Sequence, residues 1–161
     1  ADIARHACSP VSVAMVLAAA GREMDREAFA RACAHPHYDR LLGMWPLNLA
    51  RARAHGFGGV IRLFDGIGEI EALLAAGHPI VASIRFEAGG LPGAPLPRTG
   101  GHLVVLRGVG PETVLVNDPA APSDDTVERR YDRSLFLEAW LADRGVGYVL
   151  WPRRPIGDGV P

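Results

Sequence analysis

An apolar run close to the start of the chain, residues 11–20, constrains the fold more than any other feature. Cys8-Ser9-Pro10 precede the run, and Gly21 follows it. Pro10 suits the first turn of a helix, where its missing N–H is not needed, and Gly21 suits the left-handed residue after a helix. The run is shorter than the about 18 apolar residues of a membrane span. We therefore expect a buried helix inside a globular domain.

Length, composition and charge set the class of protein. The chain has 161 residues, of which 48% are hydrophobic and 22% charged, so we expect one domain spanning residues 1–161 with a sizeable core and no membrane span. The formal net charge of −1 gives no reason to expect nucleic acid as a partner. The first residue is Ala1 and no signal peptide is visible, so we expect a piece of a longer chain. Arginine-rich basic content with abundant Ala, Gly and Pro suggests a bacterial origin.

The order of the expected elements indicates an α+β fold. Helical patterns come first and strand patterns follow, without the regular alternation of a parallel sheet. The expected helices cover residues 10–20, 25–33 and 46–55, followed later by 67–76 and 135–142. The expected strands cover residues 60–64, 79–84, 102–109, 113–117, 127–131 and 147–151. These strands are expected to form an antiparallel sheet.

Cys8 lies where a helix begins, which is a favourable place for a reactive thiol. Unpaired N–H groups and the positive end of the helix dipole both favour the thiolate, the nucleophilic form. A buried structural cysteine and a Cys8–Cys33 disulfide are the alternatives. Residues 33–37 (Cys-Ala-His-Pro-His) resemble a small metal cluster, but no second group with zinc spacing accompanies them, so we expect no metal site.

His102 and the residues near 118 are the expected partners of such a thiol. His102 follows two glycines and begins an apolar strand, and the next strand ends at Asn117-Asp118. A hairpin that turns at residues 108–112 brings Asp118 or Asn117 close to His102. An acceptor at either position can hold the imidazole and stabilise its protonated form. A histidine at a strand end and an Asp-Pro turn are the alternatives without a catalytic role.

Three motifs together resemble those of a known family. The segment Cys-Ser-Pro-Val-Ser-Val-Ala-Met-Val-Leu resembles the Cys-Gly-Pro-x-Ser-x-Ala-Met-Val helix of the papain-like family-39 cysteine peptidases, which include the bacteriocin-processing, double-glycine leader peptidases. Gly-Gly-His-Leu-Val-Val-Leu resembles the family's histidine strand, and Val-Leu-Val-Asn-Asp-Pro-Ala its acid motif. The resemblance implies a papain-like fold with Cys8 as nucleophile, His102 as general base and acid, and Asp118 as the orienting residue. It also implies a peptide or protein substrate and no cofactor.

Two departures from the family pattern affect the expected site. The family has a glutamine before the cysteine whose amide completes the oxyanion hole, and this chain contains no glutamine. We expect either that the glutamine lies upstream of Ala1 or that the hole is incomplete, which typically costs about 10²–10³ in rate. Ser9 replaces the usual glycine, a change that exported relatives tolerate, and it is a candidate helix cap. His6 is a candidate for tuning the thiol or an exposed histidine, and Asn117 replaces Asp118 if the register slips.

The sequence favours a bacterial, exported cysteine peptidase but leaves two other functions open. A transglutaminase-like or acyltransferase-like enzyme would use the same three residues, and a catalytically silent binding module would keep only the fold. The Gly/Pro-rich segment 87–101 before His102 is either a substrate-binding rim or a solvated connection. The oligomeric state is not predicted.

Overall fold

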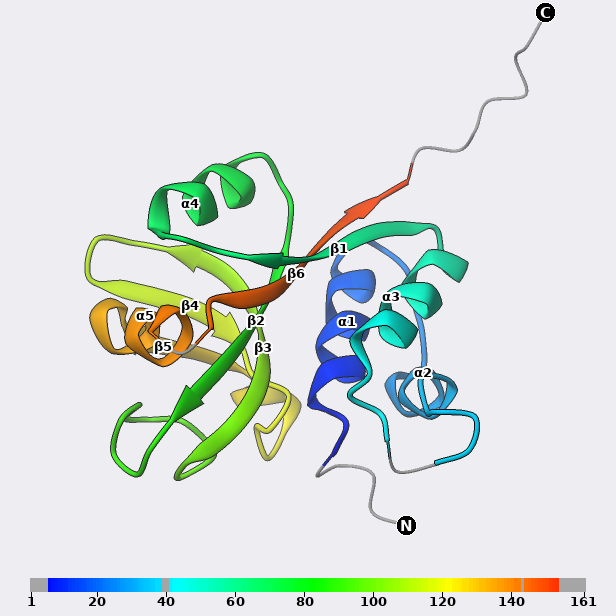
Figure 1. Ribbon diagram of the computed structural model, residues 1–161, viewed down its shortest axis with the longest axis horizontal. Helices are drawn as coiled ribbons and strands as arrows, with labels where there is room; N and C mark the ends of the chain where they lie inside the picture. The colour runs from blue at the N-terminus through cyan, green and yellow to red at the C-terminus, as the bar shows by residue number, and fades with distance from the viewer. Residues whose placement is uncertain (1–5, 39–40, 143, 154–161) are drawn as a thin grey trace, which may run out of the picture.

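The computed structural model describes residues 6–38, 41–142 and 144–153. Within these residues the helices and strands follow the predicted order (Figure 1). The helices are α1 (Cys8–Ala19), α2 (Arg26–Ala32), α3 (Trp45–Ala54), α4 (Ile67–Ala75) and α5 (Arg133–Leu141), with a short 3₁₀ helix η2 (Asp124–Thr126). The strands are β1 (Phe57–Leu63), β2 (Ile80–Phe86), β3 (Thr99–Val109), β4 (Thr113–Asn117), β5 (Glu128–Asp132) and β6 (Val146–Pro152).

The six strands form one sheet in the order β1-β6-β2-β3-β4-β5, and all of its strand pairs are antiparallel. β3, β4 and β5 follow one another as neighbours, as short connections favour. The last strand, β6, instead lies between β1 and β2, so the end of the described chain ties the helical half to the sheet. The expected α+β class with an antiparallel sheet is confirmed.

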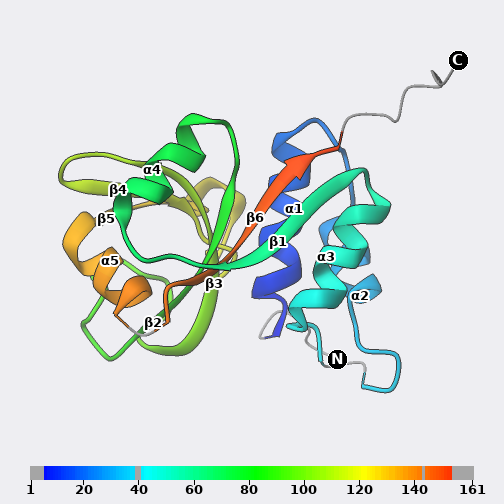
Figure 2. The same ribbon diagram turned by 45° about the horizontal axis from the view of Figure 1, so that its top comes forward.

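Helices cover both faces of the sheet, and the strand residues alternate accordingly (Figures 1 and 2). Leu103 and Val105 of β3 pack in one cluster with α1, whereas Val104 and Leu106 pack in the other with α4 and α5. Because both faces are buried there, the central strands β2 and β3 carry nearly continuous apolar runs, whereas the edge strand β5 is mostly polar and exposed. Trp140 of α5 is fully buried, and Trp45 of α3 packs partly buried against the first cluster.

Helix α1 is the buried helix that the apolar run predicts. It ends in a Schellman motif: Gly21 has a φ of 78°, its N–H donates to Ala18 O at 2.9 Å, and the N–H of Arg22 donates to Leu17 O at 3.0 Å. Near its start, the Ser12 hydroxyl donates to the Leu103 carbonyl at 3.0 Å, which fixes the helix directly on β3. The start of α1 is therefore held beside the start of β3.

The main local difference from the predicted elements lies before His102. β3 begins at Thr99, so the last three residues of the expected loop 87–101 belong to the sheet. A bulge where Ile84 pairs with His102 and Phe86 with Thr99 makes this extension possible, because it absorbs the mismatch in register.

No helix in the described part of the chain is long and apolar enough to cross a membrane.

Candidate active site

Cys8 is the first residue of α1, and it lines the same cavity as His102. Burial on its own raises the pKa of the Cys8 thiol. Hydrogen bonding to His102 and the positive charge of its ring lower this pKa, as do the backbone N–H groups of Leu103 and Ser9. Together they outweigh burial, so the pKa of Cys8 lies below its usual value. Cys8 and Cys33 are both free thiols. Burial raises the pKa of Cys33 to about 11, so Cys8 is the thiol that ionises more readily.

His102 lies near the start of β3 and bridges Cys8 and Asp118. Its Nε2 atom is 2.7 Å from Asp118 Oδ1, and its side chain is only 5% exposed. Nδ1 is then the ring nitrogen left for the sulfur of Cys8. Burial lowers the pKa of the imidazole, but the hydrogen bonds and negative charges of Asp118 and Cys8 outweigh it and raise the pKa to about 9. The opposite shifts of Cys8 and His102 favour a thiolate–imidazolium pair.

Asp118 follows the last residue of β4 and is 1% exposed. Oδ1 also accepts the N–H of Ala120 at 2.9 Å, and Oδ2 accepts the Tyr131 hydroxyl at 3.3 Å. Burial raises the pKa of this carboxyl, yet His102 and the two other donors lower it below its usual value. Tyr131, on β5, was not among the residues predicted from the sequence. Its contact depends on the pairing of β4 with β5, and the sequence around Tyr131 carries no motif that points to Asp118.

The other predicted residues lie elsewhere. The Asn117 side chain accepts a weak hydrogen bond from Arg107 at 3.5 Å, so in this register Asp118 and not Asn117 faces the imidazole. His6 is exposed and lies two residues before the first residue of α1. Ser9 is fully buried and does not cap the helix: Ala7 is the N-cap residue and forms no side-chain cap bond. The expectation of a Ser9 cap is wrong because its hydroxyl bonds to Tyr148 instead.

A cavity of about 280 Å³ opens onto Cys8 and His102. One side comes from the start of α1, and another from Pro119 and Ala120 after β4. The remaining side is formed by Leu96, Thr99 and Gly101, three residues of the Gly/Pro-rich segment before His102. This segment therefore lies at the rim of the site.

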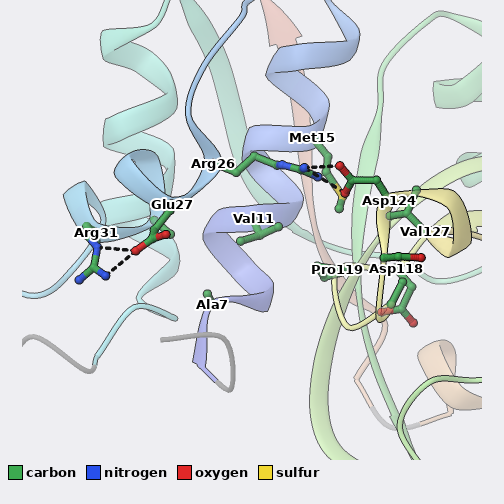
Figure 3. Close-up of a pocket in the computed structure, with 13 residues that line it drawn as sticks. Ala7, Val11, Met15, Arg26, Glu27, Arg31, Asp118, Pro119, Asp124 and Val127 are labelled. Atoms are coloured by element: carbon green, nitrogen blue, oxygen red, sulfur yellow. Dashed lines mark hydrogen bonds and ion pairs between the residues drawn. The ribbon is translucent and has the colours of Figure 1, made fainter. Parts of the chain in front are cut away.

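A second groove of about 470 Å³ adjoins this cavity and shares Ala7, Val11 and Pro119 with it (Figure 3). It runs along one face of α1, between α2 and the segment that joins β4 to β5. Arg26 of α2 and Asp124 of η2 form an ion pair there, in which Nη2 of Arg26 donates to both carboxylate oxygens at 2.8 and 3.0 Å. The pair links the helical half of the molecule to the sheet.

The described residues contain no cluster of three or more His, Cys, Asp or Glu side chains that could hold a metal ion. The reactive side chains that the site brings together are the Cys8 thiol, the His102 imidazole and the Asp118 carboxylate. A helix bearing a cysteine at its N-terminus, packed on an antiparallel sheet that supplies histidine and aspartate, is the arrangement of a papain-like cysteine peptidase.

The chain belongs to the Peptidase_C39-like family, whose model matches residues 2–148. Three solved structures share its fold with TM-scores of 0.63. A C39-like protein from Bacillus anthracis is 19% identical, with 92% of this chain and 90% of that chain covered. A double glycine motif protease from an AMS/PCAT transporter, solved in complex with the leader peptide, is 21% identical, with 90% of this chain and 84% of that chain covered. The peptidase domain of Streptococcus ComA is 14% identical, with 92% of this chain and 93% of that chain covered. No curated protein matches the chain.

Proposed function

We propose that this protein is a cysteine peptidase that hydrolyses peptide bonds through Cys8, His102 and Asp118. The observation that carries the proposal is that Cys8 lines one cavity with the buried His102, whose Nε2 atom is 2.7 Å from Asp118 Oδ1. The family match and the fold support the same class of reaction. Localisation outside the cell stays a prediction from the sequence.

The proposed reaction proceeds by acyl transfer. The Cys8 thiolate attacks the carbonyl carbon of the scissile bond and forms a C–S bond. The His102 imidazolium gives its proton to the amine nitrogen as the C–N bond breaks, which leaves a thioester. Water then attacks the thioester carbonyl, His102 takes a proton from that water, and the C–S bond breaks. The products are a carboxylic acid and the restored thiolate–imidazolium pair.

The start of α1 supplies one part of the oxyanion hole in this proposal. The first N–H groups of a helix have no acceptor within the helix, so the Cys8 N–H is free to donate to the oxyanion. The sequence holds no glutamine that could act as the second donor of the related peptidases. We therefore expect slow turnover by this chain alone, lowered by about 10²–10³ from that of a complete hole.

The substrate is proposed to be a peptide, which agrees with the neighbouring double glycine motif protease that was solved with a leader peptide. The test uses a library of quenched fluorescent peptides with the wild-type protein, Cys8→Ala and Cys33→Ala. Cleavage by the wild type and Cys33→Ala, with none by Cys8→Ala, is the expected result. Cys33 is a matched control because it is the second free thiol and lies buried.

Two outcomes would replace the proposal. Transfer of the acyl group to an added amine, without hydrolysis, would indicate an acyltransferase. Absence of turnover together with an unreactive Cys8 thiol would indicate a binding module that has only the fold.

A further inference from the structure

Three buried polar side chains lie directly behind Cys8 and come from three distant parts of the chain. They are Ser9 of α1, Asn48 of α3 and Tyr148 of β6, and each is 0% exposed. Ser9 Oγ is 2.8 Å from the Tyr148 hydroxyl oxygen, and Asn48 Nδ2 donates to Ser9 Oγ at 2.5 Å. We refer to these three residues as the Ser9 cluster.

The Ser9 cluster is not explained by stability. Asn48 Oδ1 is buried and has no hydrogen-bond partner among the described residues. A buried acceptor without a partner destabilises the folded state, and apolar side chains of similar shape would fill the same space without that penalty. A buried acceptor without a partner calls for an explanation, and its place behind Cys8 points to a role in the neighbouring site.

Ser9 connects the cluster to the nucleophile. It follows Cys8 in the first turn of α1, and its backbone N–H contributes to the lowered pKa of the Cys8 thiol. Its hydroxyl is held by two partners, on α3 and on β6, so neither the first turn of α1 nor this N–H can rotate freely. The Cys-Gly-Pro pattern that the Cys8 segment resembles has no side chain at this position, so such a cluster depends on the serine of this chain.

We propose that Asn48 and Tyr148 are positioning residues, which act through Ser9 to hold the first turn of α1 so that Cys8 faces His102. The inference rests on the proposed function and names residues outside the reacting groups. Asn48 and Tyr148 are buried and do not line the cavity at Cys8, so they hold the nucleophile without touching the substrate.

Several titratable groups surround the sulfur, and the test must account for each. His102 faces Cys8 from β3 with Asp118 behind it, and Tyr148 faces it from β6. Cys33, at the C-cap of α2, faces Tyr148. Ser9→Ala removes none of these groups. Tyr148→Phe removes one hydroxyl, and burial raises the pKa of that hydroxyl far above neutral, so it carries no charge there.

The experiment measures the rate of Cys8 alkylation by iodoacetamide against pH, with each cysteine followed separately by mass spectrometry. We expect Tyr148→Phe and Ser9→Ala each to raise the pH midpoint by roughly half to one unit, which corresponds to weakening one hydrogen bond to the thiolate. We expect the double variant to shift no further than either single variant, because both act through one contact. With a cleaved peptide, kcat should fall more than KM changes.

Trp140→Phe is the matched control. Trp140 is equally buried, and its Nε1 donates to the Val146 carbonyl at 2.9 Å on the other side of the sheet. We expect this variant to have a lower melting temperature but the same pH midpoint of Cys8 alkylation as the wild type.

The positioning role would be overturned if the pH midpoint of Cys8 alkylation stayed unchanged while only the melting temperature fell. This holds for Tyr148→Phe and for Ser9→Ala, whichever of the two folds. The alkylation readout requires no substrate. A wild type that cleaves no peptide but shows the expected shifts would therefore count against the proposed peptidase function and not against the Ser9 cluster.

Discussion

Asp118→Asn is the substitution that most directly tests the coupling between the carboxylate and the imidazole. The side chain keeps its shape and a carbonyl oxygen that can accept from His102, but it loses its negative charge. His102 is nearly buried, and its pKa is raised from 6.5 to about 9 only because Asp118 and Cys8 outweigh the effect of burial. Without the charge of Asp118, we expect this pKa to return to about its ordinary value, since burial and the remaining Cys8 contact act in opposite directions.

The size of the effect follows from how much of the His102 ring is protonated. With a pKa of about 9, about nine in ten rings carry the proton at pH 8. With a pKa near 6.5, only about one in thirty does, so kcat/KM at pH 8 should fall by roughly 30-fold. The Cys8 thiol should also ionise at higher pH, because its pKa is lowered by the protonated ring.

The assay is the pH dependence of kcat/KM for a cleaved peptide, with Cys8 alkylation as a second readout. For the wild type, activity should decline on the alkaline side as His102 loses its proton near pH 9. In Asp118→Asn this decline should move to lower pH. Asn117→Ala is the matched control, since the adjacent Asn117 bonds to Arg107 and should leave the profile unchanged. An alkaline limb that stays near pH 9 in Asp118→Asn would refute the assignment of Asp118.

Three further substitutions test the support of the site and the fold. Tyr131→Phe removes one donor to Asp118, at 3.3 Å, and should lower kcat/KM by roughly two- to tenfold with little change in KM; no change would exclude Tyr131 from the site. Asp25→Ala removes the side-chain cap of α2 and should reduce the free energy of unfolding, measured by urea titration, by about 1 kcal/mol. Glu23→Ala is the control, because Glu23 is a nearby acidic residue that is not the N-cap of α2. Phe136→Ala deletes a fully buried ring, and denaturation should show a loss of about 3–5 kcal/mol; a loss below 1 kcal/mol would contradict its place in the core.

Local signals in the sequence predicted most of the helices and strands. The sequence predicts that the second helix begins at Asp25, and Asp25 is the N-cap residue of α2, accepting two backbone N–H groups of its first turn. Gly21 was expected to follow α1, and it has the positive φ that a helix terminator of this kind requires. These features depend on a few neighbouring residues, whose preferences act whatever the rest of the chain does.

The candidate site was predictable to the extent that it uses local geometry. A hairpin between β3 and β4 is a short-range structure, so the approach of Asp118 to His102 could be anticipated from turn and strand lengths. The sequence leaves the choice between Asp118 and Asn117 open, because that choice depends on register. The bulge between Leu106 and Gly108 contributes to that register and has no clear sequence signal.

The sequence alone determined that a thiol begins a buried helix and that a histidine and an acid come from successive strands, because helix ends and hairpins are set by nearby residues. Only the tertiary structure decided that β6 lies between β1 and β2, which carries Tyr148 to Ser9, and that β5 carries Tyr131 to Asp118. Such contacts join residues whose separation in the chain leaves no local trace. These long-range contacts form only when helices pack on both faces of the sheet. The free energy of that packing comes from residues throughout the domain.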